Sequence, residues 1–483
     1  MSSTGSTDSA KSTRKTGDGL AKKTEKLKLD EAQSATPSPP KVKSKGLDVP
    51  KLWSESKDTR KSAAAFVVIG HVDHGKSTLM GRLLLDAGAV AQRDIDKYKK
   101  QATELNKSSF ALAWVMDTGS EERERGVTVD IAQHPFQTAN TDFTILDAPG
   151  HRDFVPNMLA GATMADLAVL VVDANQLESG MKGQTKEHIL LAKACGLSKV
   201  VVAVNKLDAT APKAWDEQTF HHVKAEVGKL LQSVGFEKED VLYVPCSGLG
   251  GTNVVNPAPS SGDTAWVTGA SGTLLHHLES SPAASPADDQ VKAPLRMQIA
   301  DVFRGSITNP LSVSGRIAAG NVQVGDIVVI QPSGEKATIR GIEVSSEPGD
   351  WAVATELCTL HLADIDPVHL RAGDVLCSTA QPVGVIRSFV TQVEVLEPLL
   401  PQGVDVHVGR LHVPGSVAAL ISTVDAKGEV VRKKPRVAKA GETANVKVVL
   451  ETGAPLPVGE RVVLRSGGST VASGRVGSVS VGR

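Results

Sequence analysis

The chain has 483 residues, of which 41% are hydrophobic and 22% charged, and these fractions are ordinary for folded globular proteins. A chain of this length is too long to fold around a single hydrophobic core, so we expect about three domains. Only 3% of residues are aromatic, which argues against a module that binds nucleic acid by base stacking. The formal net charge of −1 provides no overall attraction to nucleic acid, so any RNA contact must be local.

The cysteines and the first residues indicate where the protein works. Cys195, Cys246, Cys358 and Cys377 show no CxxC spacing and no clustering with histidine, which argues against a zinc site and against a disulfide framework. No apolar run approaches the roughly 20 residues of a membrane span, and the first residues do not resemble a secretion signal. We therefore expect a cytoplasmic protein with reduced thiols and no membrane partner.

Residues 1–61 are rich in Ser, Thr, Lys, Asp and Pro and contain few large apolar residues. Such a composition does not offset the conformational entropy lost on ordering, so a disordered tail is expected. Lys and Arg outnumber Asp and Glu there, which leaves two interpretations open, a solubilising linker or a weak electrostatic contact with RNA.

From residue 62 the pattern changes to buried strands that alternate with helices. Continuous apolar runs occur at residues 63–70, 143–147, 167–174, 199–205 and 241–247. Helical patterns lie between them, at residues 185–195 and 218–234 among others. This alternation predicts an α/β domain over residues 62–287, with a mostly parallel sheet covered by helices on both faces.

The second half of the chain is predicted to be all β. Residues 280–289 are rich in Ser, Ala, Pro and Asp, which indicates a linker, and short Val- and Ile-rich strands separated by Gly follow it. A break at residues 380–384 divides these strands into two sets. We therefore predict two β-barrel domains, over residues 288–383 and 384–483.

A phosphate-binding loop is the strongest motif in the sequence. Residues 70–77 fit G-x-x-x-x-G-K-[ST] between a strand and a helical pattern over residues 78–86, which is the context that the motif requires. Backbone N–H groups of such a loop point at phosphate oxygens, the lysine adds a positive charge, and the serine hydroxyl binds Mg²⁺. The predicted nucleotide-binding residues here are Gly70, His71, Val72, Asp73, His74, Gly75, Lys76, Ser77 and Thr78.

A second motif, DAPGH, begins at Asp147 and directly follows a predicted strand. Asp147 is predicted to hold Mg²⁺ through a water molecule, and the Gly150 amide to contact the γ phosphate. This motif alone is common in proteins. Its position after the phosphate loop and directly after an apolar strand supports the assignment to a nucleotide site.

A third motif, Asn205-Lys206-Leu207-Asp208, is predicted to select the base. A carboxylate can accept two hydrogen bonds from the N1–H and exocyclic amine of guanine, a pair of donors that adenine lacks. Asp208 is therefore the expected specificity residue, with Asn205 as an orienting amide and Lys206 packing over the ring. The later segment Ser247, Gly248 and Leu249 is predicted to add a further base contact.

These motifs, together with residues 123–128 (RERGVT), resemble the elongation factor one-alpha branch of translational GTPases. The resemblance implies GTP hydrolysis to GDP and phosphate that the ribosome stimulates. It also implies that Thr128 binds Mg²⁺ when the γ phosphate is present. By the same resemblance His151 is the catalytic histidine that orients the attacking water, and Val72 and Val127 form a hydrophobic gate that holds it back.

Within this branch the sequence is most similar to the Hbs-type GTPase that partners Pelota in rescuing stalled ribosomes. The similarity lies in residues 107–117, 126–130, 409–414 and 431–437. It implies a Pelota-type release-factor-like protein and the ribosome as partners, and a monomer outside that complex. The basic run at residues 432–436 has two interpretations, a contact with RNA or an acidic partner, and a solvated hairpin edge.

Two other functions remain open at this stage. The chain could carry aminoacyl-tRNA or the stop-codon release factor, because carriers of this kind share the nucleotide motifs. It could also be a scaffold of an RNA-decay complex that no longer hydrolyses GTP. The presence of Lys76, Asp147, His151 and Asp208 argues against that scaffold.

Overall fold

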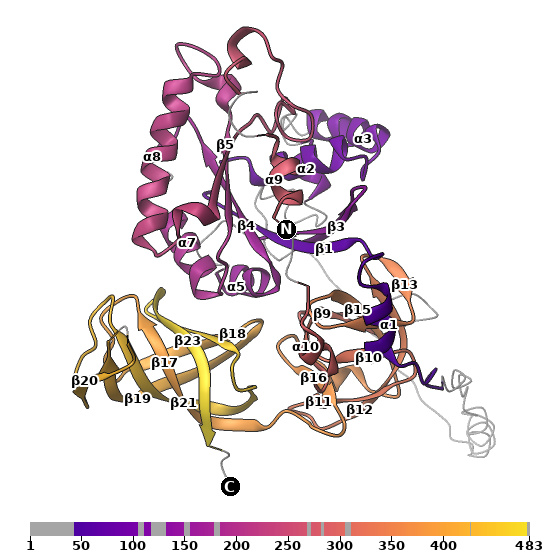
Figure 1. The fold of residues 1–483 in the computed structure, drawn as a ribbon, viewed down its shortest axis with the longest axis vertical. Coiled ribbons are helices and arrows are strands. Elements are labelled where there is room, and N and C mark those ends of the chain that lie inside the picture. The colour runs from indigo at the N-terminus through magenta and orange to yellow at the C-terminus, as the bar shows by residue number, and fades with distance from the viewer. Residues whose placement is uncertain are drawn as a thin grey trace, which may run out of the picture. The chain divides into compact units, whose positions relative to one another are not determined.

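A computed structural model describes most of the chain, and Figure 1 shows its elements in sequence colours. The described residues are 43–104, 111–116, 132–148, 155–177, 184–267, 272–281, 285–304, 311–425 and 427–480.

The first domain contains a six-stranded sheet in the order β2-β3-β1-β4-β5-β6. β2 pairs with β3 antiparallel, and the other neighbours are parallel. The strands are β1 (Ser62–Ile69), β2 (Ala132–Gln137), β3 (Thr141–Asp147), β4 (Leu167–Asp173), β5 (Val200–Asn205) and β6 (Val241–Pro245). The prediction of a mostly parallel sheet is confirmed.

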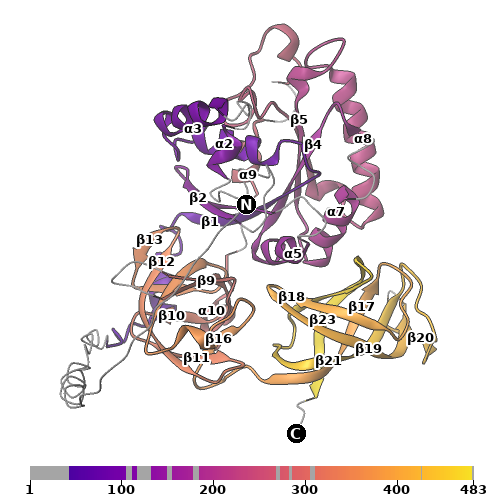
Figure 2. The same ribbon diagram turned by 180° about the vertical axis from the view of Figure 1, so that it is seen from behind.

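Helices cover both faces of this sheet, and Figures 1 and 2 show them on opposite sides. The helices and 3-10 turns are α2 (Lys76–Asp86), α3 (Gln92–Glu104), η2 (Ala113–Val115), α5 (Val155–Met164), α7 (Gln184–Ala194), η4 (Leu207–Ala209), α8 (Glu217–Ser233), η5 (Lys238–Asp240), η6 (Gly262–Thr264) and α9 (Leu274–Glu279). Alternate residues of each central strand enter two separate cores. Val67 of β1 packs with α5, α7 and α8, and its neighbour Phe66 packs with α2, α3 and α9. Burial on both sides explains why these strands are apolar without alternation.

The first barrel follows the short helix α10 (Asp288–Lys292). Its strands form a sheet in the order β11-β16-β7-β9-β15-β12-β13, in which β8 pairs with β9 and a further β11–β12 pairing closes the barrel. A separate two-stranded sheet joins β10 to β14. The elements are β7 (Arg296–Gln298), β8 (Asp301–Phe303), β9 (Ser312–Ala319), β10 (Asn321–Gln323), β11 (Ile327–Gln331), β12 (Lys336–Val344), β13 (Glu347–Gly349), β14 (Trp351–Val353), β15 (Leu357–Ala363), η8 (Pro367–His369) and β16 (Val375–Ser378).

The second barrel has the strand order β18-β22-β23-β17-β21-β19-β20 and is closed by a β18–β19 pairing. Its strands are β17 (Val385–Val395), β18 (Gly403–Val408), β19 (Leu411–Val424), β20 (Val430–Lys433), β21 (Thr443–Pro455), β22 (Arg461–Ser466) and β23 (Ser469–Ser480). Valine dominates its core, and Phe389 is the only aromatic residue in that cluster. The predicted class, an α/β domain followed by two β barrels, is confirmed.

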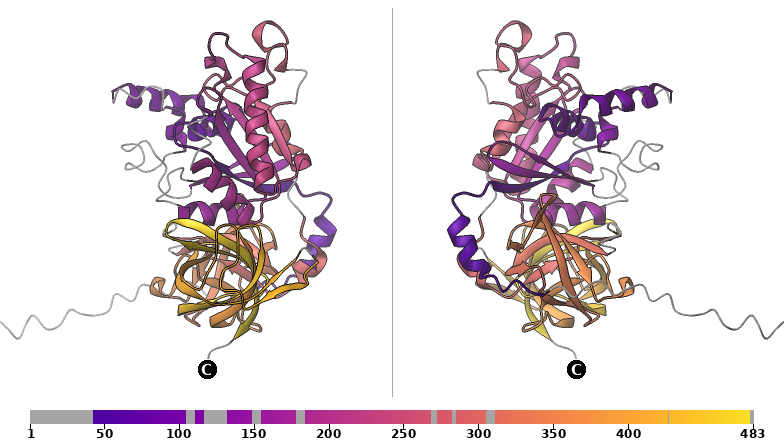
Figure 3. Two further views of the ribbon diagram at one scale, coloured as in Figure 1. Left: turned by 90° about the vertical axis from the view of Figure 1, so that its left-hand side faces the viewer. Right: turned by 90° about the vertical axis from the view of Figure 1, so that its right-hand side faces the viewer.

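The segment before β1 departs from the sequence expectation. We expected disorder as far as residue 61, but the structure contains a helix, α1 (Val49–Ser56), which Asp48 caps by accepting a hydrogen bond from the Lys51 amide. Val49 and Trp53 are buried against Val291 and Val353, and Figure 3 shows α1 beside the first barrel. Two large apolar side chains one turn apart are enough to order this short segment. The average composition of residues 1–61 does not reveal them. The expectation of disorder therefore needs correction for residues 43–61.

Among the described residues, no helix is long and apolar enough to cross a membrane.

Candidate functional site

The loop between β1 and α2 brings its backbone close to two neighbouring strands. Gly70 has φ +141°, and a Cβ there would lie 2.4 Å from the carbonyl oxygen of Val171. Gly75, the N-cap of α2, has φ +86°, and a Cβ there would lie 2.7 Å from Nδ2 of Asn205. Both glycines are thus required by conformation and by space. The loop leads into an uncapped helix N-terminus, an arrangement that favours anionic groups such as phosphate.

Lys76, Ser77 and Asp147 lie together at this loop. Lys76 Nζ donates to the carbonyl oxygens of Gly70 at 3.1 Å and His71 at 3.0 Å. Burial lowers the pKa of Lys76, and the nearby Asp147 carboxylate opposes that shift. Asp147 ends β3 and is fully buried. A buried ammonium group beside the loop is suited to neutralise phosphate charge.

The donor set at this point fits Mg²⁺. Ser77 Oγ donates to Oδ2 of Asp147 at 3.3 Å, so a hydroxyl and a carboxylate oxygen lie side by side. Mg²⁺ prefers such hard oxygen ligands and commonly completes its shell with water and substrate phosphates. Ser77 and Asp147 are thus the residues that would hold the ion.

Asn205 connects the phosphate loop to the predicted base-binding segment. Its Nδ2 donates to the carbonyl oxygen of His74 at 2.9 Å, and its Oδ1 accepts from the Gly248 amide at 2.8 Å. The sequence predicted an orienting amide, and the structure brings both of these segments to it. Both the nitrogen and the oxygen of the side-chain amide are used, so Asn205 fixes the distance between the two loops.

Lys206 and Asp208 follow Asn205 at the end of β5. Lys206 has φ +62°, and its Nζ lies 2.9 Å from Oδ2 of Asp173 and 2.6 Å from the carbonyl oxygen of Asp73. The stem of Lys206 therefore crosses between the phosphate loop and β4, next to the predicted base position. Asp208 lies in η4 and is exposed, so its carboxylate is accessible to a ligand.

The third segment lies on the other side of Asn205. Ser247 is buried and its hydroxyl accepts from the Gly250 amide at 3.0 Å. Leu249 is 58% exposed, and its carbonyl oxygen accepts a 2.6 Å hydrogen bond from Arg82. The Gly248 amide thus ties this segment to Asn205, while Ser247 holds its turn.

Sequence reasoning missed two residues of this site. Asp173 ends β4, is 1% exposed, and anchors Lys206; its position after a buried parallel strand was the available signal, as for Asp147. His188 of α7 is 2% exposed and lies close to the Gly70 backbone. No motif marks His188, because only the packing of α7 under the loop brings it there.

Part of the predicted site lies outside the described residues. Val127, Thr128, Gly150 and His151 belong to that part. Val72 and Thr78 are described and half-buried beside the phosphate loop. The roles assigned to all six residues stay predictions.

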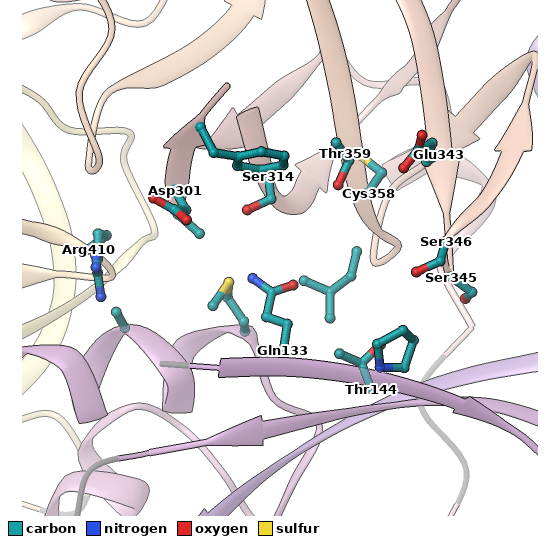
Figure 4. Close-up of a pocket in the computed structure, with 16 residues that line it drawn as sticks. Gln133, Thr144, Asp301, Ser314, Glu343, Ser345, Ser346, Cys358, Thr359 and Arg410 are labelled. Carbon is teal, nitrogen blue, oxygen red and sulfur yellow. The ribbon is translucent and has the colours of Figure 1, made fainter. Parts of the chain in front are cut away.

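A separate cavity of about 290 Å³ lies between the sheet edge of the first domain and the first barrel. Figure 4 shows Gln133 and Thr144 on one side, and Asp301, Ser314 and Glu343 on the other. None of its lining residues belongs to the predicted nucleotide site.

Comparison with protein families agrees with this geometry. The model of the elongation factor Tu GTP binding domain matches residues 61–299. The models of elongation factor Tu domain 2 and of the elongation factor Tu C-terminal domain match residues 312–377 and 403–480. Elongation factor 1-alpha of Picrophilus torridus is 40% identical over 422 residues, which cover 85% of this chain and 96% of that protein. The chain belongs to the EF-Tu/EF1-alpha family of GTPases.

Other relatives in this family have different names. The elongation factor 1 alpha-like protein of Schizosaccharomyces pombe is 38% identical and covers 93% of this chain and 76% of its own length. Protein HBS1 of Drosophila melanogaster is 36% identical, with coverages of 88% and 64%. The Ski7 GTPase-like domain of S. cerevisiae bound to GTP has a TM-score of 0.69 at 18% identity, with coverages of 88% and 98%, and shares the fold.

The family membership confirms two predictions. The chain is a GTPase that converts GTP and water to GDP and phosphate, and the ribosome stimulates translational GTPases in general. Its three matched segments confirm the architecture of a GTP-binding domain with two barrels. The bound cofactor is therefore a guanine nucleotide.

We predict that Asp208→Asn shifts base preference from guanine toward xanthine. The carboxylate's two acceptors become one acceptor and one donor, and each mispaired group costs about 1 to 3 kcal/mol. GTP affinity should fall by about 10- to 100-fold, measured by competition between GTP and XTP. The exposed Asp263, changed to Asn, is a matched control. Unchanged GTP preference in Asp208→Asn would remove Asp208 from the base site.

We also predict an acid-sensitive first domain. Burial lowers the pKa of His188 from 6.5 to about 3, and burial lowers that of His74 to about 4. The unfolded chain binds more protons in this range, so the free energy of unfolding is lost as pH falls below 6.5, by about 1.4 kcal/mol per unit for each histidine. His188→Gln should remove one such contribution between pH 6 and 4.5, measured by urea unfolding. Exposed His276→Gln should leave the slope unchanged, and equal slopes in both variants would contradict the prediction.

Proposed function

We propose that this GTPase delivers a Pelota-type release-factor-like protein to the A site of stalled ribosomes and dissociates after GTP hydrolysis. The observation that carries the proposal is the 36% identity to Protein HBS1 across 88% of the chain. The resemblance of residues 107–117, 126–130, 409–414 and 431–437 to the Hbs-type pattern supports it. We further propose that the protein acts in the cytoplasm as a monomer outside the ribosomal complex.

The proposed cycle uses the nucleotide site as a switch. Lys76 and the loop amides hold the phosphates, and Ser77 and Asp147 are the residues that would hold Mg²⁺, which would neutralise phosphate charge. Thr128 and the Gly150 amide respond to the γ phosphate and are released when it leaves. Asn205, Lys206, Asp208 and the segment 247–249 hold the guanine base.

Hydrolysis in this proposal depends on His151. Phosphoryl transfer needs positioning and charge neutralisation more than covalent chemistry. His151 orients the attacking water once the ribosome draws it past the gate formed by Val72 and Val127. The slow unaided rate therefore keeps the complex intact until it is docked.

A second candidate is a carrier of aminoacyl-tRNA. The 40% identity to elongation factor 1-alpha of P. torridus favours it, and this value exceeds the identity to HBS1. A carrier of the stop-codon release factor is the related alternative. These carriers share the GTPase site, so the partner distinguishes them.

Partner capture tests the proposal. The protein, loaded with a non-hydrolysable GTP analogue, should retain a Pelota-type protein from a cytoplasmic extract, identified by mass spectrometry. The GDP-loaded protein is the matched control and should retain less. Retention of charged tRNA or of the stop-codon release factor instead would establish the second candidate or its alternative.

The last prediction for this function concerns His151→Ala. The variant should bind GTP and assemble with its partner and stalled ribosomes, while ribosome-stimulated hydrolysis falls about 100-fold, the scale expected for a group that positions a reactant. Pelleting with ribosomes and GTP should retain the variant longer than the wild type. Phosphate release at the full stimulated rate would show that another group performs this step.

A further inference from the structure

One arginine of the first barrel holds the C-terminal end of α5. Arg316, on β9, donates from Nη1 to the carbonyl oxygen of Met164 at 2.8 Å, and Met164 is the last residue of α5. Its Nη2 forms an ion pair with Oδ1 of Asp166. Its Nε donates to the carbonyl oxygen of Thr355 in its own barrel at 2.9 Å. The guanidinium thus uses all three nitrogens and joins the two domains.

Asp166 is itself fixed to the centre of the GTPase sheet. Its Oδ2 accepts a 2.8 Å hydrogen bond from the Ala65 amide, and its own amide donates to the Ala65 carbonyl oxygen at 2.7 Å. Ala65 lies on β1, the strand that leads into the phosphate loop. Arg316 is therefore linked through Asp166 to the strand that leads into the phosphate loop.

α5 follows the predicted catalytic residue in the chain. The helix begins four residues after His151, and Met158 and Leu159 are buried in the core beneath β1 and β4. At its other end, Asn157 accepts from Arg410 of the second barrel at 3.5 Å. Figures 1 and 2 both show α5 on the side of the GTPase domain next to the barrels. A helix of ten residues is a short rigid element, so fixing one end restricts the other.

We call the contact of Arg316 with Met164, Asp166 and Thr355 the latch, and its chemistry is specific. The Arg316 and Asp166 side chains are 19% and 13% exposed, so solvent screens the pair much less than a surface ion pair. Arg316 adds positive charge at a helix C-terminus, where the helix dipole favours it. A planar guanidinium serves three acceptors in fixed directions, which a lysine ammonium on a flexible stem does not reproduce.

We propose that Arg316 is a positioning residue for GTP hydrolysis, which ties the first barrel to the C-terminal end of α5 and, through Asp166, to β1, the strand that leads into the phosphate loop. The first barrel then influences the rate of hydrolysis through the side chain of Arg316. Its effect on turnover rests on the proposed function, whereas the latch itself rests on the contacts of Arg316.

The main test separates turnover from binding. In Arg316→Met, kcat of ribosome-stimulated hydrolysis should fall about tenfold, the scale of a small misplacement near a reacting group. The Kd for GTP and the ribosome concentration at half-maximal rate should stay within about twofold of wild type. Arg340→Met, on β12 of the same barrel, is the matched control because Arg340 takes no part in this contact. Wild-type kcat in Arg316→Met, or GTP affinity reduced in proportion to kcat, would overturn the proposal.

A conservative variant and a partner variant test the latch chemistry. Arg316→Lys keeps the charge but not the three-way contact, so its kcat should lie between those of wild type and Arg316→Met. Asp166→Asn retains an oxygen for the Ala65 amide and serves as the second variant if Arg316→Met does not fold. The double variant should be no slower than the slower single variant, because both remove one contact. Additive losses, or equal rates for Arg316→Lys and Arg316→Met, would contradict the latch.

Hydrogen exchange tests the latch without the ribosome. Amides of residues 157–164 should exchange faster in Arg316→Met, while those of β17 keep their wild-type rates. Unchanged exchange in α5 would overturn the latch. Faster exchange together with full stimulated turnover in His151→Ala would leave the latch standing and would make the His151 assignment fail. Wild-type protein that stalled ribosomes do not stimulate would make the proposed function fail instead.

Discussion

The direction of the parallel strands is the constraint on which the nucleotide site depends. Because β1, β3, β4 and β5 run the same way, their carboxyl ends meet at one edge of the sheet. Gly70, Asp147, Asp173 and Asn205 follow or end these four strands, so residues far apart in sequence reach one place. The rigid, doubly covered sheet holds them there. The loops that leave this edge therefore carry the functional side chains, while the strands hold those side chains in fixed positions.

Asn205 makes the phosphate and base segments into one site. Its two hydrogen bonds, to His74 and Gly248, fix the spacing between the phosphate loop and the segment predicted to contact the base. Lys206 adds a second bridge between Asp173 and the phosphate loop. A nucleotide that contacts both segments, as we propose, meets two loops already fixed relative to each other, which reduces the entropy lost on binding.

The barrels contact the GTPase domain through both polar and apolar side chains, and Ala300 and Val463 belong to one of its cores. Arg316 contacts the end of α5, and Glu187 of α7 accepts a 2.9 Å hydrogen bond from Thr470 of the second barrel. The segment before β1 adds a further connection, since Arg60 pairs with Glu356 of the first barrel at 3.1 Å. Interfaces between domains of one chain are commonly more polar than a domain core, and these contacts fit that pattern.

The sequence by itself determined the sheet-and-helix order, the change to barrels, and the phosphate loop with Asp147 and Asn205. Each of these depends on local pattern or on a motif at a strand end, which the chain records directly. Only the tertiary structure decided the positions of His188 under the loop and of Arg316 at α5, because their partners lie far away in sequence. It also ordered α1, since Trp53 finds its apolar partners only when the first barrel has folded. Contacts of this kind are absent from any local pattern.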